Sequence, residues 1–185
     1  MKAWARRCER VTGLLAFAGC VWLGGCNSRP AHVSTTKPAG QAQTQPASTP
    51  ERMPEFDLKD TAGREVSAAQ FRGKVVLLDF WATWCGPCKK EMPGYETLYR
   101  KYKDRGLAVV GIAADSDAQV VARFGKKLGI TYPLLVNGMD VQPYGVEGLP
   151  TTILVDRGGI IRKKVVGFEY TSVIESDLRQ ILETH

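Results

Sequence analysis

A pair of cysteines, Cys85 and Cys88, constrains this chain more than any other feature of its sequence. Cysteines at this spacing can close into a small disulfide ring. The apolar run before them, residues 75–78, predicts a buried strand, and the residues from Lys89 onward predict a helix. Cys85 is therefore expected where a strand meets a helix N-terminus, because unpaired N–H groups and the helix dipole there favour a thiolate. Since the thiolate is the species that attacks disulfides, the pattern predicts thiol–disulfide exchange.

The active site of the thioredoxin superfamily closely resembles the segment Trp84-Cys85-Gly86-Pro87-Cys88-Lys89. In that family a buried carboxylate precedes the first cysteine by six residues, and this chain has Asp79 there. The family's helix-kinking proline is matched by Pro93. The resemblance also implies that Pro150, between Leu149 and Thr151, is a cis-proline that faces the dithiol.

Within the superfamily the chain is most similar to the TlpA-like and ResA-like thiol–disulfide oxidoreductases, which are tethered to bacterial membranes. Residues 56–74 resemble the added N-terminal hairpin of that group, and residues 88–93 match its active-site helix. Residues 114–137 fall where the group has an inserted helix and strand. The resemblance implies an α/β, thioredoxin-like fold: a mixed central sheet flanked by helices, with the N-terminal β-hairpin and the central helix–strand insertion.

The rest of the chain alternates predicted strands and helices. After the helix that follows the dithiol, we expect a strand at 107–113, a helix at 117–128, a short strand at 132–136 and a hairpin of strands 152–155 and 160–166. The last helix is predicted to open with a capping box formed by Ser172 and Glu175. This order favours an α/β domain with a mixed sheet.

Residues 1–25 have the pattern of a lipoprotein signal peptide, with a basic start and an apolar stretch at 11–23. The stretch is shorter than the ~20 residues that a membrane-spanning helix needs. The segment 23–26 resembles the lipobox of bacterial lipoproteins, which implies that Cys26 is lipidated and becomes the mature N-terminus. We therefore expect a lipid anchor in the cell envelope, on the periplasmic or extracytoplasmic face of a membrane; ordinary cleavage and an uncleaved anchor are the alternatives.

Residues 26–52 are rich in Pro, Thr, Gln, Ala and Ser, so we interpret them as the lipidated N-terminus and a disordered tether. Residues 53–185 then form a single thioredoxin-like domain. Cleavage before Cys26 would remove the two cysteines of the leader, and lipidation would consume Cys26 itself. Only Cys85 and Cys88 would remain, which indicates a pair kept for chemistry and not for structure.

The expected mechanism assigns Cys85 as the nucleophile and Cys88 as the resolving thiol. Asp79 is expected to accept the proton of Cys88, because burial should raise the pKa of its carboxyl. The plainer interpretation of Asp79 is a partly hydrated carboxylate. For Glu91, one helical turn past Cys88, a solvated surface position and a role in proton relay both stay open.

Four further residues are predicted to bind the substrate. The backbone of Leu149 would pair with an extended client segment, with Pro150 beside it. Trp84 would line the docking surface, whereas Trp81 is expected in the core. Gly86 and Pro87 set the geometry of the turn and leave the Cys85 sulfur accessible.

A metal site is the main alternative use of the cysteine pair. Two cysteines need further soft or imidazole ligands, and the chain has only His32 in the tether and His185 at its end. We therefore expect no metal, and no cofactor other than the redox-active Cys85–Cys88 disulfide. A copper-binding chaperone stays open as a non-enzymatic alternative. A peroxiredoxin-like peroxidase is less well supported, because Thr83 is only two residues before Cys85 and the Thr-x-x-Cys pattern is missing.

These observations favour a protein-disulfide reductase whose clients are exported proteins with reactive cysteines. The resemblance implies apocytochrome c, during cytochrome c maturation, or copper-site cysteines as clients, and a membrane thiol–disulfide carrier as electron donor. A thiol oxidase or isomerase is the alternative direction. About half of the net charge of +6 lies in the leader, so no nucleic-acid partner is indicated. We expect a monomer.

Overall fold

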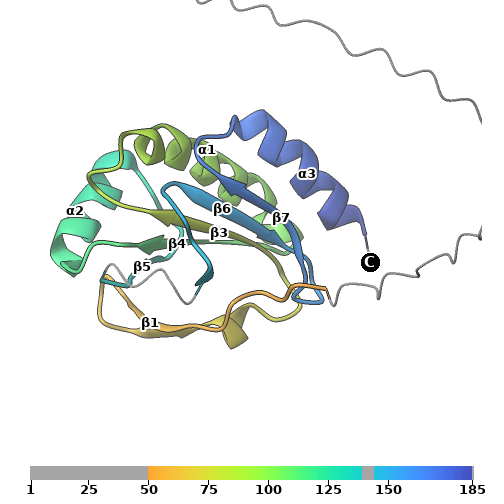
Figure 1. The fold of residues 1–185 in the computed structure, drawn as a ribbon, viewed down its shortest axis with the longest axis horizontal. Coiled ribbons are helices and arrows are strands. Elements are labelled where there is room, and N and C mark those ends of the chain that lie inside the picture. The colour runs from red at the N-terminus through yellow and green to blue at the C-terminus, as the bar shows by residue number, and fades with distance from the viewer. Residues whose placement is uncertain (1–49, 139–143, 185) are drawn as a thin grey trace, which may run out of the picture. The chain divides into compact units, whose positions relative to one another are not determined.

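A seven-stranded mixed sheet runs through the part of the chain that the computed structural model describes, residues 50–138 and 144–184 (Figure 1). The strand order is β2-β1-β5-β4-β3-β6-β7. The parallel pairs are β3–β4 and β4–β5, and the other neighbours are antiparallel. The predictions for the signal peptide, Cys26, His32 and nearly all of the tether lie outside the described residues, as does that for His185.

The strands are β1 (Asp57–Asp60), β2 (Glu65–Ser67), β3 (Val75–Trp81), β4 (Leu107–Ala113), β5 (Leu134–Val136), β6 (Thr151–Val155) and β7 (Ile161–Val166). The helices are α1 (Gly86–Tyr102), α2 (Ala118–Leu128) and α3 (Thr171–Glu183), with short 3-10 turns η1 (Ala68–Phe71) and η2 (Lys103–Arg105). The α/β class, the mixed sheet, the N-terminal hairpin β1–β2 and the inserted α2 and β5 are all confirmed.

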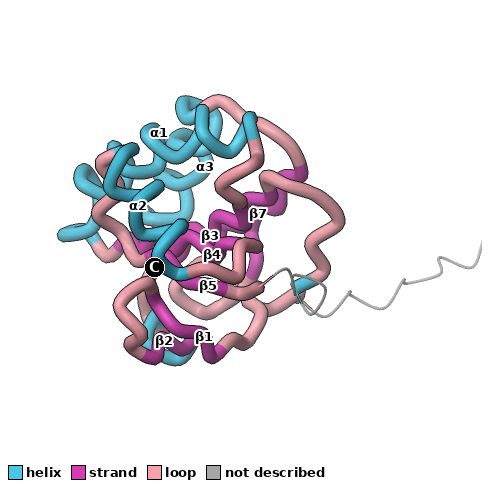
Figure 2. The backbone as a smooth tube through the Cα atoms, turned by 90° about the vertical axis from the view of Figure 1, so that its left-hand side faces the viewer, coloured by secondary structure: helices cyan, strands magenta, loops and turns pink. Residues whose placement is uncertain are grey.

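The three helices cover one face of the sheet, whereas the N-terminal segment with η1 covers the other (Figures 1 and 2). Side chains alternate between the two faces along β3, so Leu77 and Trp81 pack under the helices while Leu78 and Phe80 face away from them. Asp79 follows the same alternation and lies on the helix side. A charged residue type is thus placed inside an otherwise apolar strand that is fully buried.

Helix α1 begins at Gly86, three residues before the predicted start at Lys89. Pro87 is favoured in a first helical turn, where its missing N–H leaves no hydrogen bond unmade. Cys85 is the N-cap residue, and its Sγ accepts a hydrogen bond from the Cys88 N–H. The glycine and proline between the cysteines are therefore part of the helix.

The predicted capping box of the last helix is wrong. Tyr170 is the N-cap of α3 and makes no side-chain cap hydrogen bond, so Ser172 lies inside the first turn. The Glu175 carboxylate instead accepts hydrogen bonds from Lys101 and Tyr102 of α1. Contacts between helices thus replace the local cap that the sequence suggested.

Candidate active site

The two cysteines form a disulfide at the N-terminus of α1, with Cα atoms 5.4 Å apart. Cys85 retains 5% of its surface and Cys88 none. The Cys85 Sγ accepts the Cys88 N–H at 3.2 Å, one of the N–H groups that a helix leaves unpaired at its start. An external sulfur can therefore reach Cys85 but not Cys88.

Asp115 holds the turn that leads into the dithiol. Its carboxylate accepts hydrogen bonds from the Thr83 N–H at 2.8 Å and the Thr83 hydroxyl at 2.6 Å. Sequence reasoning missed this residue. Its position just after β4 is a usable signal, because parallel strands such as β3 and β4 end at the same edge of a sheet. Trp84 is 61% exposed beside Cys85, whereas Trp81 is buried and packs against Phe124, as predicted.

Asp79 lies buried on the face of β3 that packs under α1, and neither of its carboxylate oxygens has a hydrogen-bond partner among the described residues. Burial raises the pKa of Asp79 well above its usual range, and the charge of Glu91 raises it further. A buried carboxyl without partners favours its neutral form.

Glu91 is a second buried carboxyl, only 1% exposed, so its interpretation as a solvated residue is wrong. Its Oε1 accepts the Glu169 N–H at 2.7 Å, while Oε2 has no partner in the described part of the chain. Burial is the main cause that raises the pKa of Glu91 to about 7. Its place one turn past Cys88 was visible in the sequence, but its hydrogen-bond donor Glu169 lies 78 positions away.

Pro150 precedes β6, and the peptide bond between Leu149 and Pro150 is cis. Thr151 is paired with Phe80 in the sheet register, which places Pro150 beside the end of β3 that leads to the dithiol. The Pro150 carbonyl accepts the Gly167 N–H at 2.8 Å. Of the predicted site residues, Asp79 lies on β3, the segment 84–88 lies at or just before the start of α1, and Leu149 and Pro150 directly precede β6. Cys26 lies outside the residues that the structure describes.

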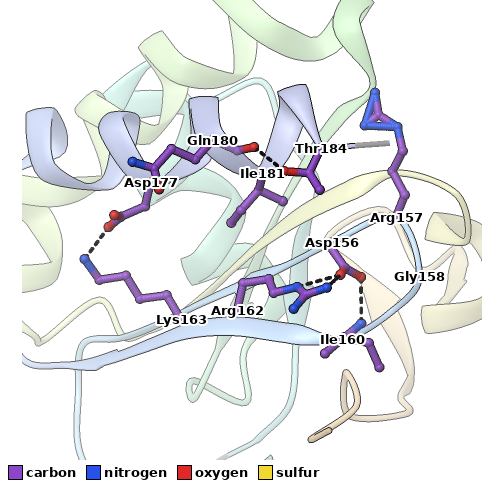
Figure 3. Close-up of a pocket in the computed structure, with 10 residues that line it drawn as sticks. All are labelled: Asp156, Arg157, Gly158, Ile160, Arg162, Lys163, Asp177, Gln180, Ile181 and Thr184. Atoms are coloured by element: carbon purple, nitrogen blue, oxygen red, sulfur yellow. Dashed lines mark hydrogen bonds and ion pairs between the residues drawn. The ribbon is translucent and has the colours of Figure 1, made fainter.

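An open cavity of about 770 Å³ lies at the opposite end of the sheet, between the β6–β7 hairpin and the C-terminal half of α3 (Figure 3). Its carboxylates are matched by cations, Asp156 by Arg162 and Asp177 by Lys163. Neither this cavity nor two smaller ones, of about 340 and 370 Å³, includes Cys85, Cys88 or Pro150.

Within 50–138 and 144–184, no three His, Cys, Asp or Glu side chains are grouped so that they could hold a metal ion. None of the helices in these ranges is long and apolar enough to span a membrane.

Comparison with known proteins identifies the family of this chain. The family described as AhpC/TSA matches residues 50–164. The chain belongs to the AhpC/TSA family. This family member is 36% identical over 133 residues to the thiol-disulfide oxidoreductase ResA of Geobacillus thermodenitrificans, across 71% of this chain and 74% of ResA.

Solved structures show the same relationship. A crystal structure assigned as the thiol:disulfide interchange protein DsbE of Chlorobium tepidum has a TM-score of 0.68 and 31% identity, over 72% of this chain and 96% of that one. A solution structure assigned as a protein disulfide isomerase of Bacteroides thetaiotaomicron has a TM-score of 0.65 and 35% identity, over 72% and 89%. The AhpC/TSA member described here is thus a ResA-like thiol–disulfide oxidoreductase with a thioredoxin-like fold.

Proposed function

We propose that this protein is a lipid-anchored, extracytoplasmic reductase of disulfides in exported proteins. The observation that carries the proposal is the asymmetry of the dithiol: Cys85 retains exposed surface at a helix N-terminus, and Cys88 is fully buried in the first turn of the helix that also contains the buried Glu91. Burial raises the pKa of both Asp79 and Glu91, which makes them stronger proton acceptors than ordinary carboxylates. That arrangement separates an attacking sulfur from a resolving one. The chemistry needs no bound cofactor.

The reaction begins with the reduced protein. The Cys85 thiolate attacks one sulfur of a client disulfide, so that a Cys85–client bond forms, the client S–S bond breaks and the other client sulfur leaves as a thiolate. The unpaired N–H groups at the start of α1 stabilise the attacking thiolate.

Resolution requires the buried Cys88 to lose its proton. Asp79 accepts that proton, and Glu91 modulates the transfer because its charge raises the pKa of Asp79. The Cys88 thiolate then attacks the Cys85 Sγ, which closes the Cys85–Cys88 disulfide and releases the second client sulfur. Two electrons pass to the client, whose thiolates take up protons from solvent.

Five residues position the client in this scheme. The backbone of Leu149 pairs with an extended client segment, and Pro150 keeps that segment beside the sulfurs. Trp84 provides exposed apolar surface next to Cys85. Gly86 and Pro87 form the first turn of α1 without a bulky side chain near the Cys85 sulfur.

The location is proposed from the sequence pattern of the N-terminal residues. Residues 1–25 serve as the signal peptide, Cys26 is lipidated, and 26–52 tether a monomeric domain at 53–185 to the membrane. Clients are exported proteins with paired cysteines, such as apocytochrome c or copper-site proteins, and a membrane thiol–disulfide carrier supplies electrons. Mass spectrometry of the membrane-extracted protein tests the anchor. A Cys26→Ser variant should lack the mass of the acyl chains and should no longer be found in the membrane fraction.

The direction of the reaction is tested by the reduction potential of the Cys85–Cys88 couple, measured against glutathione and dithiothreitol buffers. A reductase should have a potential near or below the roughly −270 mV of thioredoxin. A value close to the roughly −120 mV of the oxidant DsbA would contradict a reductase and favour a thiol oxidase or isomerase.

A further inference from the structure

Exposed large apolar side chains lie in two segments, one directly before Cys85 and one at the end of β7 and the start of α3. Among residues 50–138 and 144–184, the large apolar side chains that are exposed are Trp84, Val166, Phe168, Tyr170 and Val173. Trp84 precedes Cys85, and the other four belong to one segment at the end of β7 and the start of α3. Exposed apolar groups gathered in one place indicate an interaction surface, whereas scattered ones need no explanation.

The segment 166–170, here called the aromatic loop, is fixed to the site by two backbone hydrogen bonds. The Gly167 N–H donates to the Pro150 carbonyl at 2.8 Å, and the Glu169 N–H donates to Glu91 Oε1 at 2.7 Å. The Val166 side chain lies against Gly148, since a Cβ on that glycine would be 3.7 Å from Val166 Cγ1. The loop therefore borders the surface on which a client must lie to reach Cys85.

Close packing of α3 on α1 holds the end of the loop. A Cβ at Gly94 would lie 2.0 Å from Thr171 Oγ1, so the two helices meet at a position that only glycine can fill. Phe168 and Tyr170 form an edge-to-face ring pair with centroids 5.3 Å apart. The contact between the two rings restricts their rotamers, which reduces the entropy lost on binding.

We propose that Phe168 and Tyr170 are specificity-determining residues, which select protein clients with a large apolar or aromatic side chain beside the target cysteine. The inference rests on the proposed reduction of client disulfides at Cys85. A client segment that presents its sulfur to Cys85 next to Pro150 extends over the aromatic loop, because the Gly167 N–H of that loop is hydrogen-bonded to the Pro150 carbonyl. Exposed aromatic side chains on a rigid frame are typical of residues that dominate protein interfaces.

The test uses two synthetic peptides, each with one intramolecular disulfide, that differ only in a Phe or a Ser beside the second cysteine. The reduced protein is mixed with each peptide, and kcat/KM for peptide reduction is measured by chromatography under a thiol regenerating system. The wild-type protein should prefer the Phe peptide by about tenfold. The double variant Phe168→Ser with Tyr170→Ser should lower that ratio to about one.

The ratio of kcat/KM for the two peptides identifies a lost docking contact. A general loss of reactivity would slow the reduction of both peptides equally and leave the preference for the Phe peptide intact. An intact preference in the double variant, or equal rates in the wild type, overturns the inference while the reductase function stands. Failure to reduce either peptide overturns the reductase function and the inference with it. The single variant Tyr170→Ser should lose part of the preference and fold normally, because serine is a better N-cap for α3 than tyrosine. Tyr170→Phe retains the ring and should retain the preference.

Discussion

Helix α1 contains two buried glutamates, Glu91 and Glu96, whose surroundings have opposite effects. Glu96, in the second half of the helix, accepts hydrogen bonds from Arg100 and from both the N–H and the hydroxyl of Thr131. Burial alone would raise the pKa of Glu96, but these bonds outweigh it and lower the pKa below its ordinary value. Glu91, near the dithiol, has one oxygen without a partner among the described residues and a pKa raised to about 7.

The difference separates structural from chemical use of the same residue type. The fully paired carboxylate of Glu96 fixes α1 to the segment before β5 and has no proton to exchange near neutral pH. The incompletely paired carboxyls of Glu91 and Asp79 are expected to reduce stability, and in the proposed mechanism they serve the proton transfer from Cys88. Substitutions at Asp79 and Glu91 should therefore change the kinetics of client reduction, whereas substitution of Glu96 should change mainly the stability of the fold.

The largest effect should come from the sulfurs themselves. Cys88→Ser leaves Cys85 able to attack a client but removes the resolving thiol, so we expect turnover to fall by about a thousandfold or more. The client should accumulate as a mixed disulfide, detected by mass spectrometry under non-reducing conditions. Cys85→Ser is the control and should form no such adduct; an adduct through Cys88 would contradict the assigned order.

Asp79→Asn should have the next largest effect. It keeps the shape of the side chain but cannot accept the Cys88 proton, so resolution of the mixed disulfide should slow by about 10²-fold at pH 7. The same variant should unfold less readily at neutral pH, by about 1–3 kcal/mol, because it removes a buried carboxyl with no partners. Stopped-flow kinetics and urea unfolding test the two parts, and slower resolution with lower stability would indicate a structural role instead.

Glu91→Gln should change pH dependence more than rate. Without the charge of Glu91 the pKa of Asp79 should fall, which moves the midpoint of the pH–rate profile to lower pH with a change in rate of about threefold to tenfold.

Glu91 also affects how stability depends on pH. Its pKa in the folded protein, about 7, lies above its ordinary 4.5, so unfolding free energy should fall as pH rises through that window. Glu91→Gln should remove this decline, which amounts to about 1–3 kcal/mol. An unchanged pH profile of unfolding would show that Glu91 is not the titrating group.

Glu96→Gln should have the smallest effect on chemistry. We expect stability at pH 7 to fall by about 1–2 kcal/mol, because one of the three donors to Glu96 would face an amide NH₂. Since the folded-state pKa of Glu96 is lowered, its contribution is present at neutral pH and is lost as pH falls through that pKa. The rate of client reduction should stay within twofold of wild type; a larger loss would remove the distinction between the two halves of α1.

The sequence predicted elements whose signals are local. β4 was predicted with the bounds it has, because seven consecutive small or apolar residues between Gly106 and Ala114 leave no other buried element of that length. The dithiol was found because the cysteine pair is visible along the chain, and Asp79 because the resemblance to the thioredoxin superfamily points to the position six residues before Cys85. The start of α1 was missed by three residues because Gly-Pro was interpreted as a turn alone.

What the sequence could not predict depends on contacts between distant segments. The hydrogen bond from Glu169 to Glu91, and that from Thr83 to Asp115, join residues 78 and 32 positions apart. The capping box at Ser172 failed for the same reason, since Glu175 is held by Lys101 and Tyr102 of another helix. Such contacts follow from how the layers pack, and no local pattern in the chain specifies them.

The burial of Cys88 has a consequence for kinetics. With Cys85 the only member of the pair that retains exposed surface, every electron pair that enters or leaves the protein must pass through the same sulfur atom. The proposed electron donor, whose thiolate attacks Cys85 in the oxidised protein, and the client disulfide, which Cys85 attacks in the reduced protein, must therefore use the site in alternation. Steady-state rates should follow a ping-pong pattern in which an excess of either partner inhibits the other. The relative abundance of donor and client in the cell then limits throughput as much as the chemistry does.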